Sequence, residues 1–439
     1  MLRNSLIFAM GAAFAAVIGC LTIATPAYAG SEAVVHNFNA SNNGATDPGS
    51  GVIFDPAGNM YGITEGGGLH LLGTVYELSP AADGSWSGKI LHAFGAEGDG
   101  AEPASPLTMD ASGNLYGTTL FGGPKGQGAV FQLVHDPNGT WTEKILHSFA
   151  GGTDGYYPQG KLAIDASGNV YGTTVYGGTH GRTCDSRACG IAFELTPGAD
   201  GAWSETILHS FQNTKTDGGY PDVGITLDAS GNLYGTTETG GRDNGGTVFQ
   251  ITSSNGVWTE TTLYNFCSQV NCTDGGLSLS TLIFDPAGNL YGTNANGGAN
   301  LSQCGDGVGC GNVFELSPGA NGLWTYSILY NFCAQAKCAD GTNPGVANLI
   351  FDANGNLFGT ASKGGIKGTN CTTGCGTVYE LSPVTGAGWT ETTLYSFTPN
   401  AKNGVGINGG VVFDAAGNLY GTTSYGGAYS DGTIFTVIP

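Results

Sequence analysis

The chain has 439 residues and few charges, and most of these are acidic: 34 Asp and Glu stand against 13 Lys and Arg, which gives a formal net charge of −21. So few cations cannot neutralise a row of phosphates, which makes nucleic acid a poor partner and disfavours an anionic membrane surface. With 78 glycines and 10% aromatic residues, the composition is typical of a globular all-β protein and not of a disordered chain.

Residues 1–29 are predicted to form an export signal. Arg3 supplies its positive start, LIFAMGAAFAAVIG its apolar core and AYA at 27–29 its cleavage site. No other stretch approaches the roughly 20 apolar residues of a membrane span, so we expect a secreted protein without a transmembrane segment. One alternative is a lipid anchor on Cys20, although the residues after it are apolar where a lipoprotein tether is polar. Retention in the periplasm is the other alternative.

Residues 30–439 consist of seven tandem repeats, each marked by a close copy of DASGNLYGTT. Successive copies begin 55 to 67 residues apart, at Asp55, Asp110, Asp165, Asp228, Asp285, Asp352 and Asp414. A motif that recurs in every repeat is most simply explained as architecture, so these copies are not expected to carry the function.

Each repeat is predicted to contain four short strands, which we call a, b, c and d in chain order. In the fourth repeat they are GITLD at 224–228, NLYGTT at 232–237, GTVFQI at 246–251 and WTETTLYNF at 258–266. DASGN is a turn between strands a and b, because Asp bonds its own backbone and Gly supplies a positive φ. Seven units of four β-rich runs, without a helical period, predict an all-β, seven-bladed β-propeller of antiparallel blades.

The ring is predicted to close between the two ends of the chain. GTIFTVIP at 432–439 is a strand c, and SEAVVHNF at 31–38 matches the strand d TETTLYNF at 259–266. The N-terminal strand should therefore complete the last blade.

The repeated unit, D-x-x-G-N-L-Y-G-T-T-x-x-G-G followed by G-T-V-F-E-L-S-P, resembles the GloVer tandem repeat of secreted bacterial "choice-of-anchor" proteins. The resemblance covers residues 31–439. It implies a repeat architecture of the propeller kind in a bacterial extracellular protein, and it implies no particular activity.

Ten cysteines form five close pairs, which are predicted to be disulfides within single loops of an exported protein. The pairs are Cys184–Cys189, Cys267–Cys272, Cys304–Cys310, Cys333–Cys338 and Cys371–Cys375. Zinc is the alternative, but each loop offers two thiols without an obvious second pair. We expect neither a metal nor another cofactor.

In a propeller, the b–c and d–a loops share one face, here called the loop face, and the a–b and c–d turns share the opposite turn face. Most charged residues outside repeated positions, and all five cysteine pairs, fall in the loops of the loop face. We therefore expect the ligand there, most of all in blades 2 to 4. The candidate ligand-binding residues are Phe121, Tyr156, Tyr157, Tyr176, His180, Arg182, Arg187, Tyr220, Glu238, Arg242 and Asp243. The alternative is that long exposed loops vary without any function.

These residues favour a monomeric binding or surface-interaction module for an extracellular polysaccharide or protein, because Tyr and Arg suit both sugar rings and protein hot spots. The alternative is a propeller lyase or hydrolase, with His180 and either Tyr176 or Glu238 as acid–base groups. A gluconolactonase-like metal site is disfavoured, because the strand-a runs offer almost only apolar side chains. Catalytic residues therefore remain unassigned.

Overall fold

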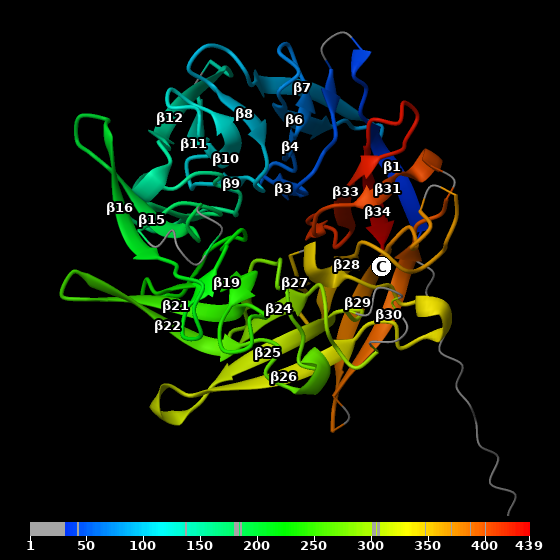
Figure 1. The fold of residues 1–439 in the computed structure, drawn as a ribbon. Helices are drawn as coiled ribbons and strands as arrows, with labels where there is room; N and C mark the ends of the chain where they lie inside the picture. Colours follow the sequence, from blue (N-terminus) through cyan, green and yellow to red (C-terminus); the bar gives the residue numbers. More distant parts are fainter. Residues whose placement is uncertain are drawn as a thin grey trace, which may run out of the picture.

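Seven four-stranded antiparallel sheets surround a common axis in the computed structural model (Figure 1). The structure describes residues 31–439 except 42–43, 137, 180–183, 185–186, 301–303, 305–307, 347, 370, 387 and 400. The expected export signal, Cys20, His180 and Arg182 lie outside the described residues. Among the described residues, no helix is long and apolar enough to span a membrane. The predicted seven-bladed, all-β propeller is confirmed.

The blades follow one another along the chain, each running from strand a near the axis to strand d at the rim. Blades 1 to 3 consist of β3 (Val52–Phe54), β4 (Met60–Thr64), β6 (Thr74–Pro80) and β7 (Trp86–Ala93); β9 (Thr108–Met109), β10 (Leu115–Gly122), β11 (Ala129–His135) and β12 (Trp141–Ser148); and β13 (Ala163–Ile164), β14 (Val170–Thr174), β15 (Ile191–Pro197) and β16 (Trp203–Ser210). Blades 4 to 6 consist of β18 (Thr226–Leu227), β19 (Leu233–Thr237), β21 (Thr247–Ser254) and β22 (Val257–Asn265); β23 (Ile283–Phe284), β24 (Leu290–Asn294), β25 (Asn312–Pro318) and β26 (Trp324–Asn331); and β27 (Ile350–Phe351), β28 (Leu357–Ala361), β29 (Thr377–Val384) and β30 (Gly388–Ser396).

Short elements on the loop face complete this list. They are β2 (Ala45–Thr46) paired with β5 (Gly66–Gly67), β8 (Gly100–Pro103) paired with β10, and β17 (Gly218–Gly219) paired with β20 (Thr239–Gly240). Single 3-10 turns lie on this face at Gly152–Asp154, Val270–Cys272, Ala336–Cys338, Pro344–Val346 and Ala401–Asn403, and on the turn face at Ala320–Gly322.

The seventh blade combines both ends of the described chain. Its strands are β32 (Val412–Phe413), β33 (Leu419–Tyr425), β34 (Thr433–Ile438) and β1 (Ser31–Asn37), with β31 (Val405–Ile407) beside β33. β1 runs antiparallel to β34, from Ser31 opposite Ile438 to Asn37 opposite Thr433, so blue and red strands lie side by side in Figure 1. The predicted ring closure is confirmed.

One carboxylate explains the repeated D-x-x-G-N-x-Y motif. Asp228 Oδ1 accepts hydrogen bonds from the backbone N–H groups of Ser230 and Asn232, at 2.8 and 2.9 Å. Its Oδ2 accepts from the Asn232 amide at 2.7 Å and from the Tyr234 hydroxyl at 3.1 Å. The next motif residue, Gly235, leaves space for an aromatic ring, since a Cβ there would lie 2.5 Å from the Phe249 ring. The motif therefore builds the a–b turn and the core below it.

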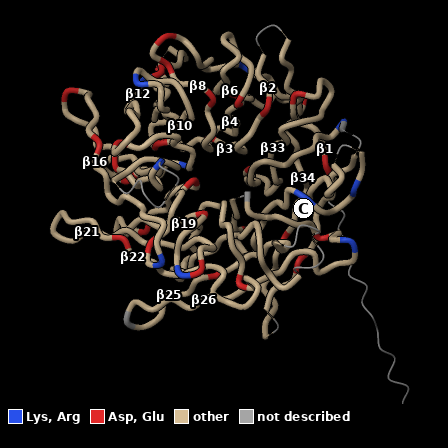
Figure 2. The backbone as a smooth tube through the Cα atoms, in the orientation of Figure 1, with Lys and Arg blue, Asp and Glu red and all other residues tan. Residues whose placement is uncertain are grey.

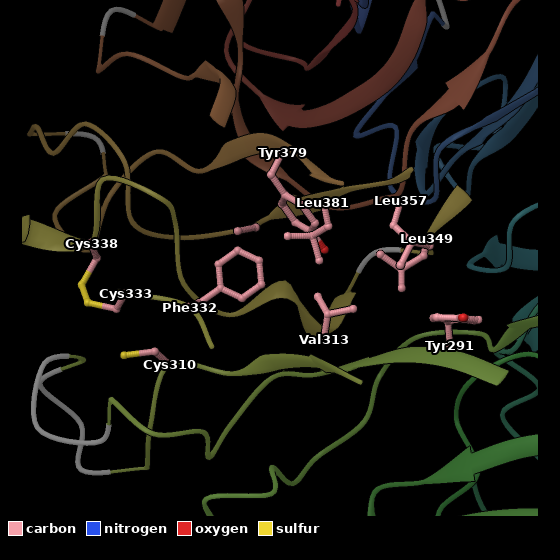
Figure 3. Packing of buried hydrophobic residues seen from close by; sticks show 11 residues of the cluster. Tyr291, Cys310, Val313, Phe332, Cys333, Cys338, Leu349, Leu357, Tyr379 and Leu381 are labelled. Atoms are coloured by element: carbon pink, nitrogen blue, oxygen red, sulfur yellow. A yellow bond between two sulfur atoms is a disulfide. The ribbon is translucent and has the colours of Figure 1, made fainter. Parts of the chain in front are cut away.

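The core lies between blades and is dominated by aromatic side chains. At each junction, a Phe that follows strand d packs edge-to-face on the aromatic residue of strand c in the next blade. Phe332 and Tyr379 are one such pair, with ring centroids 5.0 Å apart, and both are fully buried (Figure 3). Such pairs stabilise a structure by about 0.5–1.5 kcal/mol beyond the area that they bury. Every blade is thus held by its neighbours, and the ring behaves as one packed unit.

Polar links also connect neighbouring blades. Between blades 2 and 3, His147 Nε2 lies 3.2 Å from Asp154 Oδ1 and 3.8 Å from Glu205 Oε1. Burial and then the neighbouring Asp154 raise the pKa of Glu205 to about 8, so near neutral pH its protonated carboxyl donates to Asp154. We call this three-residue arrangement an interblade link. The equivalent sets are His92–Asp99–Glu143, His209–Asp217–Glu260, Tyr330–Asp340–Glu391 and Tyr395–Asn403–Glu32.

All five predicted disulfides are present, each within a single loop of the loop face. Those of b–c loops are Cys184–Cys189, Cys304–Cys310 and Cys371–Cys375, and those of d–a loops are Cys267–Cys272 and Cys333–Cys338. Several disulfides of this kind indicate an oxidising, extracellular environment.

Reduction of the disulfides is expected to leave the propeller folded. Each bond closes a loop so short that it stabilises the fold by only about 2 kcal/mol. The two rings of a junction, such as Phe332 and Tyr379, contact each other directly. We expect an unchanged β-sheet circular dichroism spectrum at 25 °C and faster proteolysis within the loops, with ten thiols alkylated as the control for complete reduction. Loss of the β-sheet signal would contradict this expectation.

Candidate binding site on the loop face

Five of the predicted site residues form one aromatic cluster on the loop face. Tyr156 and Tyr176 are stacked, with centroids 5.2 Å apart and an interplanar angle of 29°. Tyr157 packs edge-on against Tyr176 at 5.7 Å and against Phe121 at 4.8 Å. Tyr220 packs edge-on against Tyr176 at 5.7 Å. All five side chains are partly exposed, so the cluster presents ring faces and edges to solvent.

The backbone holds this cluster in place. The d–a loop at Tyr156 and the b–c loop at Tyr176 form an antiparallel bridge, in which each backbone N–H donates to the other carbonyl, at 3.0 and 3.3 Å. Val175 N–H donates to Tyr157 O at 3.0 Å. Stiff loops of this kind lose little entropy when a ligand binds.

Tyr157 and Tyr220 occupy a position with left-handed backbone, at φ 60° and 58°. A non-glycine residue in this region is strained by about 1–3 kcal/mol, and such strain is found at functional sites. Because this backbone conformation recurs around the ring, it belongs to the fold. The side chain at this position differs from blade to blade. The equivalent residues of four other blades are Asp47, Glu102, Leu277 and Asn343, with φ of 58°, 56°, 54° and 59°.

Arg187 adds a positive charge to the aromatic cluster. Its guanidinium carbon lies 4.5 Å from the centroid of the Tyr176 ring, within cation–π range. The Cys184–Cys189 disulfide closes the loop that carries it, and Arg187 N–H donates to Cys184 O at 2.9 Å. The disulfide therefore braces the loop that carries this candidate site residue.

Carboxyl groups lie next to the cluster, toward the axis. The backbone N–H groups of Asp222 and Glu238 both donate to Tyr220 O, at 3.1 Å. Burial and then the adjacent Glu238, which hydrogen-bonds to it, raise the pKa of Asp222 well above its usual range. Asp222 Oδ1 is buried without a hydrogen-bond partner. In blade 1, burial followed by the nearby carboxylates raises the pKa of Glu65 to about 7.

Glu238 also borders a cavity of about 510 Å³ between blades 4 and 5. Amide side chains line it, from Asn244, Asn271 and Asn296, together with the Cys267–Cys272 disulfide. Amides both donate and accept hydrogen bonds, as a hydroxyl-rich ligand requires.

Arg242 and Asp243 lie elsewhere on the same face. Their side chains pair with each other at 3.1 Å, and Arg242 N–H donates to Asn265 Oδ1 at the end of β22. Both residues are exposed. They therefore belong to the outer part of blade 4, and their inclusion in the ligand site stays a prediction.

Three interblade links, at His92, His147 and His209, place three ligand-type atoms within 4.8 Å of one another and could hold a cation. In other blades, Tyr and Asn take the same positions and form ordinary hydrogen bonds: Tyr330 O–H donates to Asp340 at 2.8 Å, and Asn403 donates to Glu32 at 2.6 Å. The shared pattern favours hydrogen bonding between blades over metal binding.

The family model of the Gloeobacter/Verrucomicrobia repeat matches residues 17–184 and 182–369, which together exceed half of the chain. The chain belongs to the Gloeobacter/Verrucomicrobia repeat family. This family is the GloVer repeat that the sequence motif resembles, so that prediction is confirmed. No curated protein matches this repeat protein in sequence.

Solved structures of other propellers resemble this repeat protein in architecture. A putative 6-phosphogluconolactonase from Bacteroides uniformis is 15% identical, with a TM-score of 0.47 over 81% of this chain and 89% of that chain. A putative oxidoreductase (glucose dehydrogenase) from Thermus thermophilus is 16% identical, with a TM-score of 0.41 over 76% and 96% of the two chains. At such values these likenesses say nothing about what this member of the repeat family does.

Four acidic residues of this face were not predicted from the sequence as site residues. Asp47, Glu65, Glu102 and Asp222 lie in the predicted loops but were not among the candidate site residues. The sequence held a signal for five of the six blades with the left-handed position, because this position stands eight residues before the turn aspartate; its occupants are Asp47, Glu102, Tyr157, Tyr220 and Leu277. In this member of the repeat family, the residue type at that position varies from blade to blade, while the positions around it repeat.

Proposed function

We propose that this repeat protein is an extracellular module that binds a polysaccharide on its loop face, with sugar rings packed against the Tyr156–Tyr176 pair. The stacked and partly exposed pair, with Arg187 over Tyr176, is the observation that carries the proposal. Sugar rings have apolar faces that stack on aromatic rings and hydroxyl groups that hydrogen-bond to planar polar side chains. The adjoining carboxyls and the amide-lined cavity supply such groups over an extended surface.

The carboxyl pair favours binding over glycoside hydrolysis. Asp222 and Glu238 share a hydrogen bond. The two carboxyls of most glycoside hydrolases lie about 5–9.5 Å apart, because a sugar carbon or a water must fit between them. A pair in direct contact serves better as an acceptor for ligand hydroxyl groups.

Loss of one aromatic or cationic contact is expected to weaken binding about 5- to 150-fold, which corresponds to ~1–3 kcal/mol. The test begins with a glycan array of the protein, followed by calorimetry with each hit on Tyr176→Ala and Arg187→Ala. Tyr429→Ala is a matched control, because Tyr429 is an exposed tyrosine of blade 7 on the same face. Asp200→Ala, in a c–d turn, is the control for the turn face.

Both controls should bind as the wild type does, and melting curves should show that all four variants fold. If Asp200→Ala weakens binding and Tyr176→Ala does not, the ligand occupies the turn face. If a protein array gave a hit and the glycan array gave none, the ligand would be a protein and not a polysaccharide. If the protein formed a product from a glycan, and this activity depended on Glu238, the protein would be an enzyme and not only a binding module.

A further inference from the structure

The propeller encloses an apolar channel along its axis. A cavity of about 530 Å³ is lined by strand-a residues of the blades, among them Ile53, Ala163, Leu227, Ile283 and Val412. This lining agrees with the mostly apolar strand-a runs of the sequence. A second cavity of about 290 Å³ forms the mouth of the channel on the loop face. The channel volume is in the range of small-molecule sites.

Six residues line both cavities and so form a collar between the polar mouth and the apolar channel. This axial collar consists of Ser50, Pro106, Lys161, Thr281, Asn348 and Gly410. One of them, Lys161, is a cation, and it lies two residues before the start of β13. The chain thus places a positive charge at the neck of an apolar channel in a protein of net charge −21.

The Lys161 side chain is partly buried in the collar and has no described carboxylate beside it. Burial lowers its pKa, and among the described residues no carboxylate lies within 4.0 Å of its Nζ. A buried charge normally has a partner of opposite sign, because it has lost its hydration. A ligand could supply that partner.

Further hydrogen-bond donors stand beside Lys161 in the collar. Asn348 Oδ1 accepts from Thr281 N–H at 3.0 Å, so the amide NH₂ of Asn348 is left to donate. Gly224 lies between Lys161 and Thr281, since a Cβ there would be 2.7 Å from both Lys161 Cβ and Thr281 Oγ1. Blades 3, 5 and 6 thus present an ammonium, a hydroxyl and an amide on one side of the collar, which together suit the oxygens of an anion.

The mouth and the channel narrow the choice of ligand. Glu65 and Asp222 line the mouth, and burial raises the pKa of both carboxyls, so they oppose the entry of an anion less than two ionised carboxylates would. One lysine balances one negative charge, which favours a carboxylate over a phosphate of nearly double charge. The apolar wall below the collar requires a hydrocarbon or aromatic body.

We propose that the axial channel binds an amphipathic monocarboxylate, with its carboxylate on Lys161, Thr281 and Asn348 and its apolar body in the channel. This site lies below the proposed polysaccharide surface, which it meets at Asp222 in the channel mouth, and it can be tested without any glycan. Octanoate is the probe, with octan-1-ol as the neutral probe of equal length and acetate as the anion without a tail.

Calorimetry of the whole protein should show that octanoate binds at least about tenfold more tightly than octan-1-ol or acetate. Lys161→Met, which keeps the length of the side chain, should lose about tenfold or more in octanoate affinity. Without ligand, this variant should melt at the same temperature or higher, because a partly buried charge without a carboxylate partner is removed. Octanoate should raise the melting temperature of the wild type and not that of the variant.

Lys402→Met is the matched control, because Lys402 is an exposed lysine of a d–a loop, and it should bind octanoate as the wild type does. Equal binding of octanoate and octan-1-ol, or equal binding by wild type and Lys161→Met, would overturn the proposal. Absence of octanoate binding to the wild type at millimolar concentration would overturn it as well. If Lys161→Met failed to fold, Lys161→Gln would replace it, with the same loss of affinity expected.

Discussion

Removal of residues 31–38 is expected to lower the melting temperature of the propeller by about 10 °C or more, or to prevent folding altogether. These residues form β1, which pairs with β34 over its whole length and supplies strand d of blade 7. The deletion also removes Phe38, which is 3% exposed and packs on Tyr76 at a centroid distance of 5.1 Å. Loss of a buried Phe alone costs about 3–5 kcal/mol.

The deletion would affect both neighbours of blade 7. Glu32 accepts hydrogen bonds from the Tyr395 hydroxyl at 3.2 Å and from the Asn403 amide at 2.6 Å, which join blade 6 to blade 7. β34 would become an open edge, and an open edge promotes aggregation. Thermal melting and size-exclusion chromatography would measure both effects.

Two point variants separate packing from the mere presence of the strand. Phe38→Ala should lower stability by about 3–5 kcal/mol, while Ser41→Ala, in the exposed loop that follows, should have no measurable effect. An unchanged melting curve for the truncated protein would show that the ring does not depend on β1.

The stability of the propeller is expected to fall as the pH rises from about 6.5 to about 8.5. Burial, followed by the neighbouring Asp, raises the pKa of Glu143 and Glu205 to about 8. Burial also raises the pKa of Glu260 and Glu391 to about 7. The folded state thus holds protons that the unfolded state, with glutamate near 4.5, has already released. The stabilisation is fully present at a pH below the glutamate pKa of the unfolded state. It is lost as the pH rises through the glutamate pKa of the folded state.

Buried histidines make stability rise with pH, which is the opposite effect, but they do so mainly at lower pH. Burial lowers the pKa of His36 and His147 below 6.5, so their contribution is lost as the pH falls through the folded value. In the unfolded state, where the histidine pKa is 6.5, these two groups become largely neutral only above about pH 7.5, so below that value they make the decline shallower without causing it. The decline between about 6.5 and 8.5 therefore reports the glutamates.

Each unit of pKa shift corresponds to about 1.4 kcal/mol, reduced here because the links are partly exposed to solvent. We expect the melting temperature to fall by several degrees in total. Urea unfolding at several pH values would measure the slope, which Glu205→Gln should flatten because glutamine stays neutral. Glu97→Gln, at an exposed loop position, is the matched control and should leave the slope unchanged. If stability rose over this pH range, the glutamates of the interblade links would not be protonated in the folded state.

The sequence alone determined the fold of this protein, because the information is local and repeated. The turn motif shows its partners within six residues, as in Asp228 and Tyr234, and seven copies remove the ambiguity of one. Ring closure followed from matching 31–38 to the other d strands. The disulfides followed from spacing, since cysteines as close as Cys184 and Cys189 have few other partners within reach.

The contacts that could carry function depend on tertiary structure. Lys161 and Asn348 are 187 residues apart in the chain, and they meet at the collar because equal positions of different blades converge on the axis. The arrangement of the blades likewise brings Tyr156, Tyr176 and Tyr220 together. Arg242 is close in sequence to Glu238, but its backbone lies beside Asn265 at the end of strand d of its own blade. The sequence shows which position each residue occupies within its repeat. Which side chains touch across blades is set by the packing of one blade on the next.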